Sequence, residues 1–453
     1  MLAKIFTTDS ELGKESFVLF PEQRNTLLEI EGKISQLLKL SDFIPVRVAF
    51  ATYAANYLNQ VPLWVMIVAP PSSGKTEILG CLYKLPQAQV ISDLTKGSLL
   101  SGTSQKEKAK NATGGLLKLL GKFGFLIFKD MTSLLSKQKD AAAELFAALR
   151  EIADGDFVRF FGNDGGTHKE WAGRMGVIAA VTPEIEKHRA SFSSMGDRFL
   201  TVRVYNDSNL RMAQAQKALR SSGNELRIRK ESQELTENLF QDFQQDMVLP
   251  KERFEFILDY IAPLSAFIAS CRTPVERSGY SRNIEFIHTT EGYPRLAKQL
   301  YGLFCGCITI GCSLQESWEI TLRVAMDTIP EQRAQVLEAV LQYEKDTGKC
   351  VFTLEKLRAV TRLPKRTNER IVDDLYSVGV LDRDKGTGKS PYVFWFSDMM
   401  RENIESFSLT PVEPSCFPEI LDDPIPTNGN VEYRGNSNEE TESFSREEAE
   451  NAA

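Results

Sequence analysis

The chain has 453 residues, of which 42% are hydrophobic and 25% charged, a composition typical of an ordinary globular protein of two or three domains. Its net charge of −7 comes from positions 418–453, which hold ten acidic and two basic side chains, so bulk charge gives no argument for a nucleic-acid partner and any basic surface must be local. Seven cysteines without a framework, and no stretch of ~18 apolar residues, argue against a disulfide-rich secreted protein and a membrane span, so we expect a cytoplasmic protein.

The pattern of apolar residues divides the chain into six segments. They are mostly helical residues 1–44, an α/β core over 45–205, a connecting segment over 206–250, helical residues 251–330, a compact module of helices and a hairpin over 331–400, and an acidic tail over 408–453. In the core, apolar runs alternate with helical patterns, which predicts a parallel sheet covered by helices on both faces. The tail is rich in Pro, Asn, Ser and Glu, and we expect it to be disordered because it cannot bury enough apolar surface to offset its ordering entropy.

The strongest motif is a strand that runs into a tight loop and then a helix. After the apolar run 65–68 come Ala69, Pro70, Pro71, Ser72, Ser73, Gly74, Lys75, Thr76 and Glu77. This pattern predicts a P-loop, in which backbone N–H groups hold phosphate oxygens, Lys75 reaches the β- and γ-phosphates and the Thr76 hydroxyl ligates Mg²⁺. Ala69 stands where the first glycine is usual, and alanine fits there if its φ is negative. We therefore expect ATP and Mg²⁺ as cofactors.

An acidic strand end is the second part of such a site. Residues 125–128 form an apolar run that ends in Lys129-Asp130, and the carboxyl ends of neighbouring strands meet at one edge of a sheet. Two acids are usual here, one for the Mg²⁺ shell and one to polarise the attacking water. In one register Lys129 replaces the first acid and Asp130 is the second; in the other Asp130 holds the metal and Met131 replaces the base. Both registers remain open, and both put hydrolysis in doubt more than ATP binding.

The order of these motifs resembles the AAA+ ATPases over about residues 45–330. The resemblance implies a P-loop core with a helical lid in an oligomeric ring, expected to be a homo-hexamer. It implies that Thr182 is the sensor 1 residue, which touches the γ-phosphate or water. It also implies that Arg198 is an arginine finger for the ATP of a neighbouring subunit and that Arg295 is the sensor 2 residue of the lid, facing the nucleotide.

A β-hairpin is predicted just before the sensor 1 strand. Residues 156–161 are followed by a glycine-rich turn at 162–166 and then by residues 168–171, which together suggest the two strands and the turn of a hairpin. This placement resembles the AAA+ branch that contains the minichromosome maintenance helicases and magnesium chelatases, in which such a hairpin points into the ring pore and touches DNA or another polymer. The resemblance implies Arg159, His168 and Lys169 as contacts. A hairpin that only packs on the sheet is the alternative.

The module over 331–400 looks like a winged helix, which is three helices followed by a β-wing. Thr353 is a natural N-cap for its second helix, and Gly379 ends the third as a C′ glycine. In DNA-binding versions the third helix enters the major groove and the wing meets phosphates. The DNA contacts expected on these two elements are Lys365, Arg366, Thr367, Asn368, Arg370, Arg383, Lys385 and Lys389. A winged helix that binds a protein is the alternative.

Two further clusters are expected to be structural. The cysteines between positions 305 and 312 lie in an apolar helical run and predict buried thiols rather than a metal site. The basic residues Arg227, Arg229 and Lys230 are flanked by acids, which predicts a solvated helix face.

These features predict an AAA+ ATPase that couples ATP binding or hydrolysis in a ring to the loading, remodelling or unwinding of DNA. Its arrangement resembles the replication initiators, helicase loaders and helicases of phages and other mobile elements. One rival is an ATP-dependent switch that assembles on DNA and hardly hydrolyses, which Lys129 favours. The other is a protein remodeller whose winged helix or acidic tail binds a protein partner.

Overall fold

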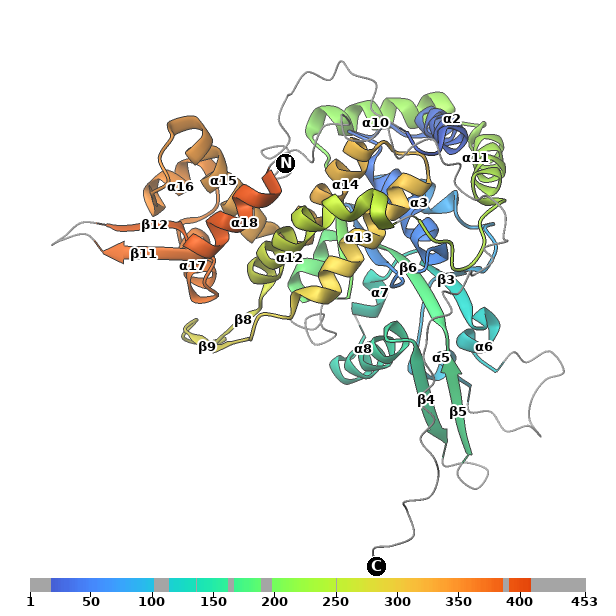
Figure 1. The fold of residues 1–453 in the computed structure, drawn as a ribbon, viewed down its shortest axis with the longest axis horizontal. Coiled ribbons are helices and arrows are strands. Elements are labelled where there is room, and N and C mark those ends of the chain that lie inside the picture. The colour runs from blue at the N-terminus through green and yellow to red at the C-terminus, as the bar shows by residue number, and fades with distance from the viewer. Residues whose placement is uncertain are drawn as a thin grey trace, which may run out of the picture. The chain divides into compact units, whose positions relative to one another are not determined.

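A computed structural model describes residues 18–101, 114–135, 137–161, 167–188, 198–249, 251–385 and 391–408 (Figure 1). Lys389, the predicted turn at 162–166 and all but the first residue of the predicted tail lie outside this part of the chain.

A five-stranded sheet with entirely parallel pairing forms the centre, which confirms the predicted α/β class. Its strands, in sheet order, are β2 (Ala88–Ile91), β3 (Phe123–Phe128), β6 (Arg174–Val181), β1 (Trp64–Val68) and β7 (Leu200–Arg203). In the register, Val68 is opposite Val181 and Phe128 is opposite Ala179. The carboxyl ends of β1, β3 and β6 therefore lie at nearly the same level, and the residues that follow these strands lie along one edge of the sheet.

Both faces of the sheet are buried, as a parallel sheet requires. Alternate residues of β1 point to opposite faces, so that Val65 and Ile67 join one apolar cluster while Met66 and Val68 join the other. The second face is covered by α5 (Lys96–Leu99), α6 (Leu116–Leu120), α7 (Thr132–Leu135) and α8 (Lys139–Ala153). From α8 the chain enters the hairpin of β4 (Asp156–Phe161) and β5 (Thr167–Ala172), and the short helix η2 (Pro183–His188) follows β6.

Helix α3 (Ile44–Tyr57) covers the first face and is buried along nearly its whole length. It lies between the sheet and α13 (Tyr293–Thr309). A Cβ atom at Gly306 of α13 would meet the backbone of Ala51, so a residue without a side chain allows the two helices to approach this closely. The N-terminal helices thus belong to the core.

The segment predicted as a connection is largely helical. It consists of α10 (Ser208–Ser221) and α11 (Glu225–Phe240), and α11 packs on both α2 (Pro21–Leu37) and α4 (Lys75–Gly80). The helical region that follows contains η3 (Lys251–Ile257), α12 (Leu258–Arg272), the hairpin of β8 (Val275–Arg277) and β9 (Ile284–Ile287), then α13 and α14 (Leu314–Thr328).

One helical stretch among the described residues, Phe254–Arg272, is long and apolar enough to cross a membrane, which the sequence did not lead us to expect. In the structure 61% of its apolar window is buried, and a helix in a protein core meets the same criteria of length and composition.

The C-terminal module begins directly after α14. Its elements are α15 (Glu331–Thr347), β10 (Phe352–Thr353), α16 (Leu354–Thr361), α17 (Lys365–Ser377), β11 (Leu381–Lys385), β12 (Tyr392–Phe396) and α18 (Asp398–Ser408). The Thr353 side chain accepts a hydrogen bond from the backbone N–H of Lys356, so the predicted N-cap is present. Gly379 has a φ of +75°, as predicted for the residue that ends α17. Helix α18 was not predicted; its Phe407 packs 5.4 Å from Phe267 of α12.

Candidate nucleotide site and its surroundings

The loop after β1 has the backbone expected of a phosphate loop. Gly74 has a φ of +87° and Ser72 a φ of +60°, so two of its residues are left-handed. The positive φ of Gly74 favours glycine there, and a Cβ atom would also meet the end of the Leu38 side chain. The Lys75 amine donates hydrogen bonds to the carbonyl oxygens of Ala69 (2.5 Å) and Pro70 (2.9 Å). The loop therefore carries a lysine ammonium folded across it, while Pro70, Pro71, Ser72 and Thr76 are exposed.

Two predicted residues lie on the neighbouring strand ends. Because β6 lies between β1 and β3, Thr182 stands between the loop and Asp130. Burial lowers the pKa of Lys75, and the negative charge of Asp130 opposes this shift, so the two charges lie close enough to interact. The structure thus brings Lys75, Asp130 and Thr182 to one edge of the sheet.

Thr132 joins this edge and was not predicted. Its hydroxyl accepts a hydrogen bond from the Thr182 N–H (3.0 Å) and lies 3.4 Å from the Thr182 hydroxyl. The Asp130 carboxylate accepts from the Thr132 N–H at 2.9 Å, so it caps α7. Lys129 instead places its amine 5.5 Å from the centre of the Tyr83 ring. The sequence signal that could have identified Thr132 is its hydroxyl, two positions after Asp130.

Further side chains from the segment after β7 contact the loop. Asn206 donates to the buried hydroxyl of Ser73 at 3.1 Å. Arg229 of α11 donates two hydrogen bonds to the Glu77 carboxylate, at 2.9 and 2.7 Å. The Arg229 side chain is 46% exposed, in line with the predicted solvated face, and it also pairs with an acid next to this loop because α11 packs on α4.

Arg198 and Arg295 lie in another place, at the amino end of β1. Both line a cavity of about 480 Å³ beside Trp64, together with Arg174 and Gln299. One terminal nitrogen of Arg198 lies 2.7 and 2.6 Å from the two carboxylate oxygens of Asp154 on the same chain. Its side chain is only 9% exposed.

The sequence led us to expect that Arg295 faces the nucleotide. In the structure, Arg295 does not face the loop of its own chain. The first turn of α13 lies beside Trp64, which begins β1, whereas the loop follows Val68 at the other end of that strand. Gln299, one turn further along α13, donates to the backbone carbonyl of Arg198 at 2.6 Å and holds the two segments together.

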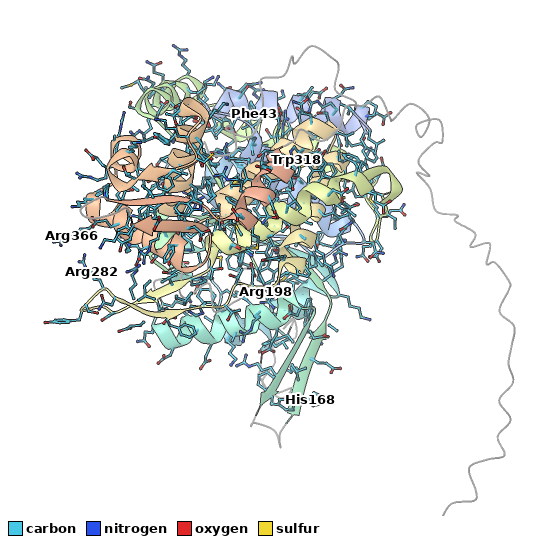
Figure 2. The ribbon with its side chains drawn as sticks, turned by 60° about the vertical axis from the view of Figure 1, so that its left-hand side comes forward. Phe43, His168, Arg198, Arg282, Trp318 and Arg366 are labelled. Carbon is cyan, nitrogen blue, oxygen red and sulfur yellow. The ribbon has the colours of Figure 1, made fainter. Side chains whose placement is uncertain are left out.

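Two of the three residues predicted to contact a polymer from the β4–β5 hairpin, Arg159 and Lys169, donate hydrogen bonds within the chain. Arg159 donates to the carbonyl oxygens of Lys96 (2.9 Å) and Leu100 (2.8 Å), and the Lys169 amine donates to that of Ser101. His168 is exposed near the end of the hairpin (Figure 2). Beside it lies Phe160, which is 77% exposed and was not predicted as a contact.

The prediction that Asn368 contacts DNA is wrong. It is fully buried, and its side-chain amide bonds to the Thr361 hydroxyl and the Leu363 carbonyl oxygen. It holds the turn between α16 and α17 closed and cannot reach a groove.

Most of the other predicted contacts are exposed, and several also pair with a neighbouring side chain; the Lys365 amine, for example, lies 3.7 Å from the Glu369 carboxylate. Lys365 and Arg366 are exposed on the first turn of α17, and Thr367 is half-buried; Figure 2 shows Arg366 at the edge of the module. Arg370 donates to the Gln332 side chain at 2.8 Å. On the hairpin, Arg383 lies 3.9 Å from the ring centre of Tyr376 and donates to Asp373 at 3.3 Å, while Lys385 is exposed.

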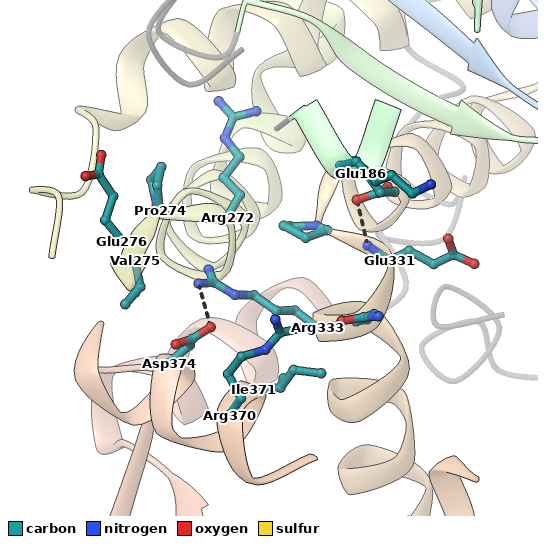
Figure 3. Close-up of a pocket in the computed structure, with 13 residues that line it drawn as sticks. Glu186, Arg272, Pro274, Val275, Glu276, Glu331, Arg333, Arg370, Ile371 and Asp374 are labelled. Atoms are coloured by element: carbon teal, nitrogen blue, oxygen red, sulfur yellow. Dashed lines mark hydrogen bonds and ion pairs between the residues drawn. The ribbon is translucent and has the colours of Figure 1, made fainter. Parts of the chain in front are cut away.

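A cavity of about 460 Å³ marks the junction between the core and this module (Figure 3). Two of its arginines pair with acids: Arg333 lies 3.7 Å from Asp374, which also lines the cavity, and Arg272 pairs with Glu291, which lies outside the lining. The Glu186 carboxylate accepts from the Glu331 N–H at 3.4 Å. These pairs indicate a structural joint that involves η2, α12, α15 and α17.

No family model matches the sequence, and no curated protein matches it. Among solved structures, the chain is similar to the NrS-1 C-terminal region in its A-form apo state, with a TM-score of 0.30 and 10% identity over 86% of this chain and 79% of that one. It is also similar to the active helicase Cch of SCCmec type IV, with a TM-score of 0.31 and 10% identity over 87% of this chain and 72% of that one. Likeness at this level does not bear on the activity of the chain.

Proposed function

We propose that the chain is an AAA+-type ATPase that binds ATP with Mg²⁺ at residues 69–77 and acts on DNA. The observation that carries the proposal is the Lys75 amine held across a left-handed loop, with Asp130 and Thr182 on the adjoining strand ends. Loops of this conformation present N–H groups to anions, and a lysine ammonium adds the charge that phosphates require. The carbonyl oxygens that Lys75 now contacts are partners that a phosphate can replace.

The residues present also fit a magnesium ion. Mg²⁺ prefers oxygen ligands and is held by one or two protein groups together with phosphates. Thr76 and Asp130 supply a hydroxyl and a carboxylate at this edge of the sheet. ATP with Mg²⁺ would supply the transferable phosphoryl group, while Lys75 neutralises charge and Thr182 orients a γ-phosphate oxygen or a water molecule.

A switch with slow hydrolysis is the second candidate. Asp130 is the one acid in the Lys129-Asp130 pair, its carboxylate caps α7, and Lys129 faces the Tyr83 ring. No second carboxylate from that pair is there to polarise water. We therefore expect tight ATP binding together with slow ATP hydrolysis.

We further propose that a second copy of the chain completes the site. Arg198 and Arg295 share one cavity at the end of β1 opposite the phosphate loop, where they cannot serve their own loop. In a ring with head-to-tail contacts, that surface meets the loop of the next subunit. Arg198 would then exchange Asp154 for a phosphate and stabilise the charge that develops on it.

We propose that the C-terminal module is a winged helix that binds DNA. The β4–β5 hairpin would be a second DNA-binding element. The exposed cations Lys365, Arg366 and Lys385 support phosphate contacts by α17 and the wing. The exposed Phe160 beside His168 fits a polypeptide as well as a nucleic acid, so a protein remodeller remains the alternative.

ATP hydrolysis by the purified chain, with and without single- and double-stranded DNA, tests the proposal. We expect slow turnover that DNA stimulates and that Lys75→Ala abolishes. Tight ATP binding without turnover would favour the switch. Turnover unaffected by DNA, together with no DNA binding at low salt, would favour the protein remodeller, and no ATP binding would overturn all three.

A further inference from the structure

The Arg229–Glu77 pair is an unusual feature of the proposed nucleotide site. Glu77 follows Thr76 directly and adds a carboxylate to the first turn of α4. Arg229 lies 152 positions further along the chain and contacts both carboxylate oxygens. This two-point geometry is the strongest form of a hydrogen-bonded ion pair.

Without a partner, the Glu77 carboxylate would oppose the binding of phosphates. Thr76 and the backbone beside it are where a P-loop holds its metal and the α- and β-phosphates. A unit negative charge a few ångströms from an anion is repulsive, and the repulsion grows when the site is partly shielded from water. The Glu77 side chain is only 22% exposed, so water screens it incompletely.

The packing of α11 fixes the backbone that carries Arg229, although the arginine side chain is 46% exposed. Ile228 and Ser232 of this helix are buried, at 3% and 2% exposure. One turn after Arg229, Gln233 donates to the carbonyl oxygen of Gly80 at 2.8 Å, so α11 contacts both ends of α4. The guanidinium is therefore delivered by a packed helix.

We propose that Arg229 is part of the nucleotide site, where it neutralises Glu77 and thereby lets the loop bind a nucleoside polyphosphate. This inference rests on the proposed ATP site. It assigns α11 a role in ligand affinity, in addition to its packing against α2.

The test is a titration of the full-length chain with a fluorescent ATP analogue and Mg²⁺, using Arg229→Ala, Glu77→Gln and the double variant. Arg229→Ala should weaken binding about tenfold, because it leaves Glu77 uncompensated. Glu77→Gln should bind at least as well as the unchanged chain. The double variant should recover to within about twofold of it, and the Arg229→Ala defect should shrink as salt is raised.

Arg227→Ala is the matched control. Arg227 lies on the same helix and pairs at 2.6 Å with Glu231, away from the loop, so its loss should leave nucleotide affinity unchanged. Thermal melting of each variant separates a folding defect from a binding defect, and recovery in the double variant would by itself show that the site is folded.

Distinct outcomes separate this inference from the proposed function. Arg229→Ala that binds as well as the unchanged chain, while Lys75→Ala does not bind, would overturn the inference and leave the ATP site standing. A double variant as weak as Arg229→Ala would also overturn it, because Glu77 would then not be the reason. An unchanged chain that binds no nucleotide would overturn the proposed function and the inference with it.

Discussion

The two ends of β1 carry positive charge in different ways. At the carboxyl end, Lys75 donates to two backbone carbonyl oxygens, which are weak competitors for an anion. At the amino end, both carboxylate oxygens of Asp154 already accept from Arg198. A phosphate can displace the first set of contacts at low cost, but at the second it must replace an ion pair. On the proposed function, the loop would bind ligand within one chain, whereas the arginine cavity would act only after a partner subunit rearranges it.

The largest effect should come from removing the loop cation. We expect Lys75→Ala to weaken ATP binding at least about 100-fold, since losing one member of a buried charged contact costs about 2–5 kcal/mol. A fluorescent-nucleotide titration measures this. Lys129→Ala is the control, because its amine faces Tyr83, and it should bind as the unchanged chain does. Equal losses in both variants would mean that the position of Lys75 is not special.

Replacing Arg198, at the amino end of β1, should change the rate of ATP hydrolysis and leave nucleotide affinity unchanged. We expect Arg198→Ala to lower the hydrolysis rate about 100-fold while nucleotide affinity stays within about twofold. Mixing inactive Arg198→Ala and Lys75→Ala chains should restore part of the activity, because some interfaces then combine an intact loop with an intact arginine. If Arg198→Ala lost nucleotide affinity as Lys75→Ala does, the two ends would act within one chain and the comparison would fail.

A smaller effect tests which polar side chains of α17 belong to the fold. Asn368→Ala should lower the free energy of unfolding by about 2 kcal/mol, because it leaves the buried polar groups of the turn without their partner. Chemical denaturation measures this. An unfolding midpoint equal to that of the unchanged chain would contradict the structural role of Asn368.

The smallest effect should come from the exposed neighbour of Asn368. Arg366→Ala should leave stability unchanged and weaken DNA binding about fivefold, with a shallower dependence on salt, because one phosphate contact is lost. Fluorescence anisotropy with labelled duplex DNA at two salt concentrations measures this. Loss of stability without loss of affinity would assign Arg366 to the fold and favour a protein partner for α17.

The sequence predicted the features that depend on local pattern. The alternation of apolar runs and helices indicated the parallel sheet, and the cap at Thr353 and the glycine at Gly379 were visible as single residues in the right place. The tight loop after β1 and the strand end before Asp130 followed from residue types at short spacing. These features need only neighbours along the chain.

The features that were missed depend on contacts between distant segments. Nothing near Arg229 in the sequence points to Glu77, and nothing near Arg295 shows at which end of β1 the first turn of α13 lies. Asn368 looked like its basic neighbours because its burial depends on how α17 is rotated toward Thr361. Such placements follow from packing, which a single sequence does not display.

Arg203, the last residue of β7, and Arg277 of β8 affect how the chain unfolds. The Arg203 guanidinium bonds to Glu186 of η2 and to the carbonyl oxygens of Asp327 and Ile329, just before α15. Arg277 of β8 bonds to Asp373 and Asp374 of α17. The Arg203 bonds lie within the core and hold the segment that leads into α15. Separating the C-terminal module from the core would instead leave Arg277, Asp373 and Asp374 partly buried without these partners, which is costly. Melting should therefore be cooperative, with the module and the sheet losing their structure in one transition instead of two.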